Sequence, residues 1–424
     1  MKNRPVLRCL ATAVALVSLA AACGRGDGDT GSGSYPDPGI TDGEIVVGAN
    51  APLTGPGSGF ANVVYGASAF FGHLNETEGG VTMADGKKRK VRYIYYDDGY
   101  QPAKTVEVVK RLVEKDKVFA LAGGFGTATN LAVRDYLNQK GVPQVFIQSN
   151  SPKWGAEFKK YPFSLSGSPS AATEAAVFAQ YVQRERPKAK VAILTVGDDN
   201  GAGFLNGFKE ALKGTDMTIV SEQTYANTDA SIDSQMSIMA SSGADVFANF
   251  ATPKFTALAI KGAAELGWKP LHLVASQGSS PEAVFKPAGL ENAKDIVTVG
   301  WFKDPTDPQW AADETIRTLQ RSVQKYEPRA NPKDSFAVAG WALAEVFTNV
   351  LKDVDPTRSS LMDAVHGLNG QTSSALLPKL ESRTSPTDGF PLETLWLQRF
   401  DGGKYEFIGA EPISLEGRTP VGER

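Results

Sequence analysis

Strand-like and helix-like segments alternate along almost the whole chain after residue 43, and this alternation is the strongest constraint on its fold. Short runs rich in β-branched residues, such as 45–48 and 91–96, are each followed by apolar residues at helical spacing, as in 61–74 and 103–115. Parallel strands joined by helices form a sheet that is covered by helices on both faces. The pattern therefore predicts an α/β fold with doubly wound parallel sheets.

The alternation occurs in two successive blocks, which predicts two lobes of similar architecture. The first block continues with strands at 119–122 and 145–147 and a helix near 130–139. After Ser164 we expect strands at 191–196, 218–221, 246–250 and 272–275, with helices at 171–184, 204–212, 232–240 and 255–266. The remaining segments are expected helices at 313–326, 336–351 and 360–367 and strands at 395–400 and 405–408. A chain of this length is too long for one typical hydrophobic core.

The N-terminus has the features of an export signal. Lys2, Arg4 and Arg8 are followed by an apolar run that ends at Cys23. The run is shorter than the roughly 20 apolar residues that a membrane-spanning helix needs. We therefore interpret residues 1–22 as a signal peptide and exclude them from the fold.

The segment around Cys23 resembles a bacterial lipobox, in which the cysteine is lipidated and becomes the new N-terminus. Ala20 departs from that pattern, because leucine usually stands there and here lies one place earlier, at Leu19. Residues 23–43 are rich in Gly, Asp, Ser and Pro, which is typical of a flexible tether. An ordinary secreted protein with an incidental cysteine is the alternative. We expect a protein anchored by lipid to the outer face of the cytoplasmic membrane.

Composition argues against a fold stabilised by disulfides and against a nucleic-acid-binding protein. Cys9 leaves with the signal peptide, so the mature chain has no cysteine pair and must be stabilised by its core. A formal net charge of −3 and a pI of about 5.8 give no reason to expect a nucleic-acid partner.

Several motifs, in their order and spacing, resemble the type I periplasmic solute-binding proteins of the Leu/Ile/Val-binding class. They are Ile45-Val46-Val47-Gly48, Pro52 to Pro56, Asn75, Gly79-Gly80-Val81, Asp97-Asp98, Pro102-Ala103-Lys104, Gly141-Val142-Pro143, Gly201 with Gly203, Gly207-Phe208 and Gly243 to Val246. The resemblance implies two α/β lobes joined by three crossovers, one at 44–164 with 302–388 and the other at 165–301 with 389–424. It further implies a monomer that captures a small solute between the lobes and passes it to the permease subunits of an ABC importer.

The resemblance also implies which residues hold the solute. The turn Gly123 to Thr129 follows a strand and opens a helix, where free N–H groups and the helix dipole can hold an anion. With the next strand-end loop, it would contribute Phe125, Thr127, Thr129, Gln148, Ser149 and Asn150. A simple Gly-rich turn capped by Thr127 is the alternative. A dinucleotide fingerprint is a weaker one, because Thr129 stands where that motif wants Gly or Ala.

Further positions suggest the chemistry of the solute. Phe60 and Phe336 stand where aromatic walls are expected, although either could be plain core. Asn200 replaces a tyrosine, and Gln277 replaces the acid with which amino-acid binders neutralise the solute ammonium. A buried ammonium without a carboxylate partner is costly, so we expect a carboxylate or neutral amide with an apolar or aromatic body rather than a standard branched-chain amino acid.

The sequence offers no catalytic constellation. His73, His272 and His366 are far apart, no nucleophile elbow occurs, and the acidic pairs at 97–98 and 198–199 are typical of solvated turns. We expect a protein that is not an enzyme and that needs no cofactor or metal. A secreted hydrolase or amidase and a ligand-sensing receptor of the same fold, such as an amide sensor, remain alternative functions.

Overall fold

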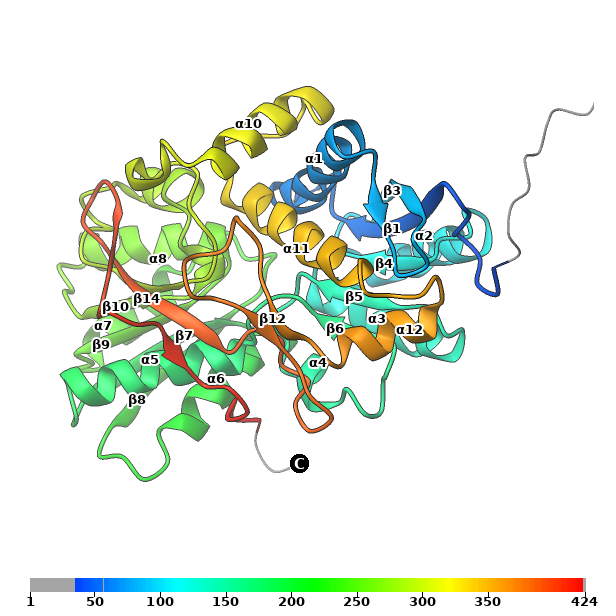
Figure 1. Cartoon of the computed structure of the whole chain (residues 1–424). Coiled ribbons are helices and arrows are strands. Elements are labelled where there is room, and N and C mark those ends of the chain that lie inside the picture. Colours follow the sequence, from blue (N-terminus) through cyan, green and yellow to red (C-terminus); the bar gives the residue numbers. More distant parts are fainter. Residues whose placement is uncertain (1–34, 56, 422–424) are drawn as a thin grey trace, which may run out of the picture. The chain divides into compact units, whose positions relative to one another are not determined.

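The computed structural model describes residues 35–55 and 57–421, and these residues form one compact unit. Within the described residues, two separate sheets carry the fold, and each is flanked by helices (Figure 1). The expected α/β fold with two parallel-dominated, doubly wound sheets is therefore confirmed. We call each sheet together with its helices a lobe, the first and second in chain order.

The first sheet has the strand order β2-β3-β1-β4-β5-β6. Its central strand β1 is buried along almost its whole length, as expected for a parallel strand covered on both faces. All its neighbouring strands pair in parallel except β2, which runs antiparallel to β3 at the edge. The strands are β1 (Glu44–Ala51), β2 (Val81–Thr82), β3 (Lys88–Asp97), β4 (Ala120–Ala122), β5 (Gln144–Ile147) and β6 (Ser164–Ser166).

The helices of the first lobe come from distant parts of the chain. α1 (Asn62–Thr77) packs against α11 (Ser335–Leu351), and Figure 1 shows the two side by side. Gly340 and Gly66 allow this approach, because a Cβ on Gly340 would overlap the carbonyl oxygen of Val63 and one on Gly66 that of Ala337. The other helices are η1 (Ser58–Ala61), α2 (Pro102–Glu114), α3 (Thr127–Gln139), α4 (Lys153–Ala156), α10 (Glu314–Tyr326) and α12 (Arg358–Val365).

The second sheet has the strand order β15-β14-β11-β10-β9-β7-β8. The strands from β11 to β8 pair in parallel, whereas β14 and β15 are antiparallel additions at one edge. The strands are β7 (Lys190–Val196), β8 (Thr218–Tyr225), β9 (Val246–Phe250), β10 (Leu271–Val274), β11 (Val297–Gly300), β14 (Thr394–Phe400), β15 (Tyr405–Phe407) and the short β16 (Ile413–Ser414). The helices are α5 (Ala171–Glu185), α6 (Asp199–Ala211), α7 (Asp233–Ser241), α8 (Pro253–Glu265), η2 (Ser276–Gly278), η3 (Pro281–Phe285), α9 (Lys286–Ala288) and η4 (Pro308–Trp310).

The chain passes between the lobes three times, between β6 and α5, after β11, and before β14. The third passage brings β14 beside β11 from the opposite direction, which explains its antiparallel pairing. The residue limits 44–164 with 302–388 and 165–301 with 389–424 stay a prediction. A small hairpin, β12 (Asn369–Gln371) with β13 (Ser382–Arg383), precedes this passage and was not predicted from the sequence.

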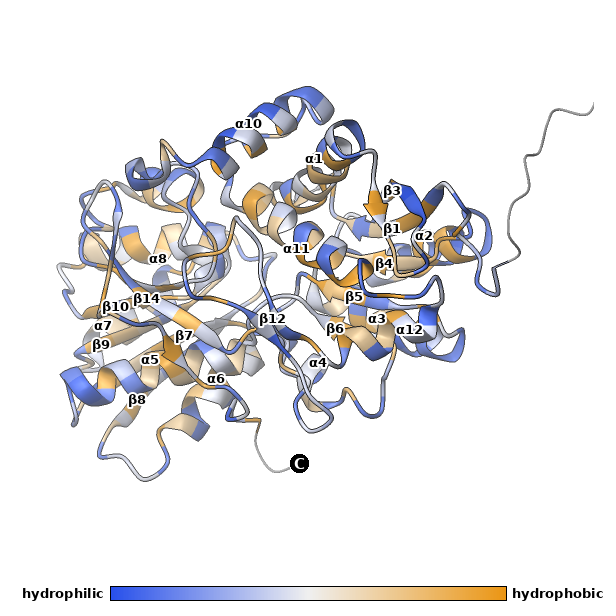
Figure 2. Cartoon of the chain, in the orientation of Figure 1, coloured by the Kyte–Doolittle hydropathy of each residue, from blue (hydrophilic) through white to orange (hydrophobic). Residues whose placement is uncertain are grey.

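Hydrophobic residues lie mainly on the strands and on the inner faces of the helices, while α10 is hydrophilic except where it packs (Figure 2). Residues 1–22 and Cys23, to which the signal and anchor predictions refer, lie outside the described residues. Among the residues that are described, no helix is both long enough and apolar enough to cross a membrane.

Candidate functional site

A cavity of about 610 Å³ lies where the strands of both sheets end. Its wall is built from loops that follow strands of the first sheet and strands of the second sheet. Because carboxyl ends of parallel strands meet at one edge of a sheet, α/β folds form crevices there. The volume lies within the range of about 300–1,000 Å³ that is common for small-molecule sites. The predicted residues in this wall are Phe60, Phe125, Thr127, Gln148, Ser149, Asn150, Asn200, Gln277 and Phe336.

Aromatic rings form one side of the cavity. Phe60 and Phe125 are stacked with centroids 4.3 Å apart, and Phe336 meets Phe60 edge to face at 5.0 Å. Tyr100, whose ring lies 6.2 Å from that of Phe125, extends this wall and was not predicted. Its φ of 59° is unusual for a residue other than glycine, and it follows the Asp97-Asp98-Gly99 turn. An aromatic residue directly after such a turn could have indicated it.

The turn that opens α3 places polar groups beside these rings. Gly126 has a φ of 105°, and a Cβ there would lie 2.5 Å from Thr129 Oγ1, so glycine is required. The backbone N–H of Gly126 donates to Gln148 O at 3.1 Å, and this hydrogen bond joins the turn to the loop after β5. Thr127 Oγ1 lies 2.8 Å from Ser149 Oγ, and Trp154 Nε1 donates to the same oxygen of Ser149 at 2.8 Å.

Thr129 is the one predicted solute contact that is not in the cavity wall. Its side chain is fully buried, and its hydroxyl donates to Phe125 O at 2.9 Å. Thr129 therefore stabilises the conformation of the turn without contacting the cavity.

The second lobe contributes Asn200 and Gln277, which bond to each other. Asn200 Nδ2 donates to Gln277 Oε1 at 3.0 Å. Gln277 Nε2 lies 3.3 Å from Phe250 O and 3.4 Å from Ala251 O, so the amide of Gln277 is used within the protein. Asp198 caps α6 and accepts from the backbone N–H of Asn200 at 2.9 Å.

Although Gln277 replaces the acid of amino-acid binders, the cavity wall does contain carboxylates, because Asp198 and Asp334 both belong to it. Asp334 caps α11, accepting from Phe336 N at 2.8 Å and from Asn62 Nδ2 at 3.1 Å. Burial, with a smaller effect from the charge of Asp304, raises the pKa of Asp334 to about 6. An aspartate directly before the apolar stripe of a helix is an N-cap signal that could have placed it next to Phe336.

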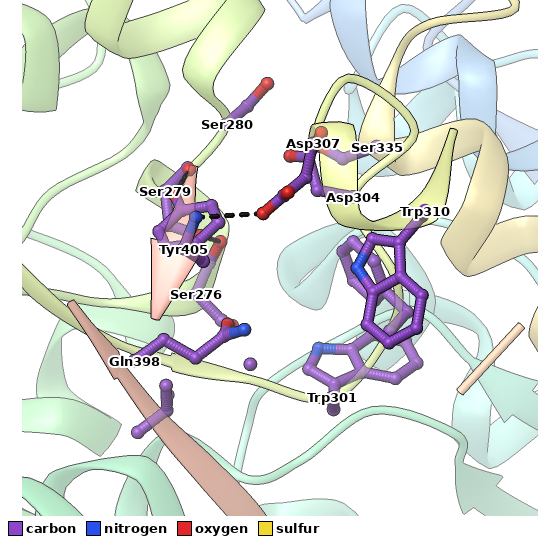
Figure 3. A pocket seen from close by; sticks show the side chains of 13 residues that line it. Ser276, Ser279, Ser280, Trp301, Asp304, Asp307, Trp310, Ser335, Gln398 and Tyr405 are labelled. Atoms are coloured by element: carbon purple, nitrogen blue, oxygen red, sulfur yellow. Dashed lines mark hydrogen bonds between the residues drawn. The ribbon is translucent and has the colours of Figure 1, made fainter. Parts of the chain in front are cut away.

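A second, much smaller cavity of about 20 Å³ adjoins the first and shares Ser276, Trp301 and Phe302 with it (Figure 3). In Figure 3 the backbone N–H of Tyr405 donates to Asp307, at 2.8 Å. Asp304 also lines this cavity, and burial raises its pKa to about 6. This volume can hold about one water molecule.

The acidic pair at 97–98 differs from the expected solvated turn. Asp98 is fully buried and accepts from Asn50 Nδ2 at 2.8 Å and from Tyr100 N at 2.9 Å. It therefore positions the loop that carries Tyr100. The three histidines lie apart. Burial lowers the pKa of His272 to about 3, and the ring of His272 stacks on that of Phe247.

Three carboxyl groups outside both cavity walls lie close together. Within residues 35–55 and 57–421, oxygens of Asp388, Glu393 and Glu416 lie within 4.8 Å of one another. Glu393 is buried and accepts from the backbone N–H of Gly417 at 2.6 Å and of Thr419 at 3.1 Å. The group thus holds the C-terminal segment to the residue before β14.

Comparison with known proteins identifies a family and individual relatives that the chain resembles. Residues 44–404 match the family model described as "Periplasmic binding protein". The chain is 28% identical over 204 residues to Leu/Ile/Val-binding protein homolog 3 of Brucella melitensis biotype 1, covering 48% of this chain and 53% of that protein. It is 22% identical over 204 residues to an amino acid binding protein of Pseudomonas aeruginosa, covering 48% and 52%. The chain thus matches about half the length of these curated relatives.

Solved structures share the fold over most of the chain. A branched chain amino acid ABC transporter structure from Thermus thermophilus with bound valine has a TM-score of 0.74 at 17% identity, covering 88% of this chain and 97% of that chain. The fatty acid ABC transporter substrate-binding protein from Thermomonospora curvata has a TM-score of 0.72 at 20% identity, covering 91% and 97%. Since the family model spans most of the sequence, the chain belongs to the periplasmic binding protein family.

Proposed function

We propose that this protein is the extracytoplasmic solute-binding component of an ABC importer, that it is exported and anchored by lipid on Cys23, and that it is not an enzyme. The observation that carries the proposal is the 610 Å³ cavity, whose wall combines strand-end loops of both lobes. A solute that contacts both lobes stabilises the closed arrangement by its differential affinity. The closed, loaded protein would then be what the permease subunits recognise.

The wall supports a solute with an apolar or aromatic body. The rings of Phe60, Phe125 and Phe336 supply an apolar surface, and Thr127 at the start of α3 supplies a polar end. The N-terminus of a helix favours a carboxylate or carbonyl oxygen. A carboxylate, an aromatic acid, an amide or an amino-acid-like compound would fit these groups. Among the proteins of the same fold, the Thermus thermophilus structure holds valine, and the Thermomonospora curvata protein is a fatty acid ABC transporter substrate-binding protein.

The test is to identify the solute directly. Protein purified without denaturation would be extracted, and the extract analysed by mass spectrometry for compounds present at about one per chain. We expect one organic solute that is returned unchanged after incubation with the protein. Conversion of that solute into a product would favour the hydrolase alternative and contradict the proposal.

Small-angle scattering tests the mechanism. Adding the identified solute should reduce the radius of gyration, because the lobes close around it. An unchanged radius at saturation would contradict the closure mechanism. Solute uptake by the permease should also be compared between the parent protein and a variant that cannot bind the solute. Equal uptake with both proteins would instead favour a sensing role.

A further inference from the structure

Glu174 lies behind the wall of the cleft and contacts residues of both lobes. It is fully buried in the first turn of α5. Its Oε1 accepts from Asn150 Nδ2 at 3.1 Å and from Ser276 Oγ at 2.7 Å, and its Oε2 accepts from Ser276 N at 3.0 Å. Asn150 follows β5 of the first sheet, and Ser276 follows β10 of the second. Asn150 and Ser276 line the large cavity, whereas Glu174 does not.

The three bonds dictate which atoms Asn150 and Ser276 can offer to a solute. An ionised carboxylate only accepts hydrogen bonds. Asn150 must therefore turn its NH₂ group toward Glu174, which leaves Oδ1 as the amide atom directed away from it. Ser276 uses its hydroxyl proton on Glu174, so only its oxygen lone pairs remain. Asn150 Oδ1 and Ser276 Oγ are thus acceptors in the cavity wall.

We propose that Glu174 is a positioning residue that sets the hydrogen-bonding polarity of this part of the cleft, so that the solute must bring an N–H or O–H donor to Asn150 and Ser276. This inference rests on the proposed function, because it concerns the same cleft. It narrows the solute class to compounds such as amides and amines and disfavours esters and simple hydrocarbon acids. A buried acceptor left without a donor is costly.

The surroundings of Glu174 make this polarity depend on pH. No basic side chain of the described residues is among the groups that shift its pKa. Burial raises its pKa to about 7, opposed by the bonds from Ser276 and Asn150. No charged group of α6, β11 or β14, the elements packed against α5, contributes to that shift. A protonated Glu174 would donate one bond, and the partner that accepts it would lose its acceptor role toward the solute.

Glu174→Gln should reverse the polarity at any pH. The backbone N–H of Ser276 is a fixed donor, so the glutamine must present its Oε1 there. Its NH₂ group then faces Asn150 and Ser276 Oγ. Asn150 would turn its Oδ1 inward and present its NH₂ group to the solute, and the Ser276 hydroxyl would be free to donate.

The experiment uses two probes of nearly the same shape, N-methyl-3-phenylpropanamide and methyl 3-phenylpropanoate, which differ by an N–H in place of an oxygen. Calorimetric titration at pH 8.5 should show the amide binding about tenfold more tightly than the ester to the parent protein. The preference should shrink at pH 5.5. Glu174→Gln should abolish or reverse the preference at both pH values.

Two further variants keep the test specific. Glu393→Gln removes another buried carboxyl, whose pKa burial raises to about 8 and which lies outside both cavities, and should leave the preference unchanged. Ser276→Ala removes one acceptor and should reduce the preference even if Glu174→Gln does not fold. Asp334 titrates in the same pH range and lines the cavity, but it is present in both parent and Glu174→Gln. The difference between those two proteins therefore isolates Glu174.

The inference is overturned if the ester binds the parent as tightly as the amide at pH 8.5, or if Glu174→Gln keeps the parent's preference. If neither probe binds, the same titration is made with the solute that co-purifies with the protein. An affinity for that solute with the same pH dependence in parent and Glu174→Gln overturns the inference, and a dependence lost in the variant supports it. A protein that binds no solute at all would contradict the proposed function itself.

Discussion

Gly340→Ala tests the close packing of α1 on α11, which joins two distant parts of the chain into the first lobe. The added Cβ would overlap the main-chain oxygen of Val63 and would lie 3.1 Å from Ala67 N. Backbone atoms of a helix cannot rotate away, so α1 and α11 must separate until ordinary contact, at 3.4 Å or more, is restored. Overpacking of this kind costs about 1–3 kcal/mol or more. It outweighs the gain of about 1 kcal/mol that alanine brings to a helix.

We therefore expect Gly340→Ala to lower the free energy of unfolding, measured by urea denaturation followed by circular dichroism. Gly262→Ala in α8 is the matched control. Its Cβ would lie 3.2 Å from Met236 Cγ, a flexible side chain that can shift, so the helix-forming gain should dominate. If Gly340→Ala proves as stable as the parent, or changes as Gly262→Ala does, the close backbone approach does not hold the lobe together as argued.

Three further outcomes are expected. Cys23→Ala should release the protein from membranes or block its processing, and full membrane partitioning of the variant would contradict the anchor. Phe60→Ala should weaken binding of the aromatic probe amide by about tenfold or more in calorimetric titration, because Phe60 stacks on Phe125 at 4.3 Å; an unchanged affinity would place the solute elsewhere. Burial raises the pKa of Asp304 and Asp334 to about 6 and that of Glu393 to about 8, so these carboxyls favour folding most at low pH and lose that contribution as the pH rises from about 4 through 8. The melting temperature should then be lower at pH 8.5 than at pH 5.5, with a smaller difference in Glu393→Gln, and a higher value at pH 8.5 in the parent would contradict the sign.

Most long elements could be predicted because burial leaves a mark in the sequence. β1 is a continuous apolar run because helices cover both faces of its sheet, and α2 shows apolar residues on one face only. β6, with the sequence SLS, was missed because three residues carry no period. β11 is only four residues long and contains a threonine and a glycine, so it too lacked a clear signal.

The site was predicted in part. The loops after β4 and β5 were recognisable because a strand followed by a glycine-rich turn and a helix has a local signature. Asp334 was missed because its position depends on α11, which reaches the cleft from a part of the chain about 200 residues away from those loops. Gln277 lies in the cavity wall as predicted, but residue type alone could not show that its amide also bonds to Phe250 O, Ala251 O and Asn200.

The sequence by itself determined the α/β class, the order of the main elements and the loops that could meet at the strand ends, since local periodicity and turn chemistry encode these directly. Only the tertiary structure decided which side chains share one wall and what each can still donate or accept. Glu174 is an ordinary helical residue in the sequence, and it acquires its role because folding brings Asn150 and Ser276, 126 positions apart, to one carboxylate. Hydrogen-bond polarity depends on the whole set of partners around a group, and that set exists only once the chain has folded.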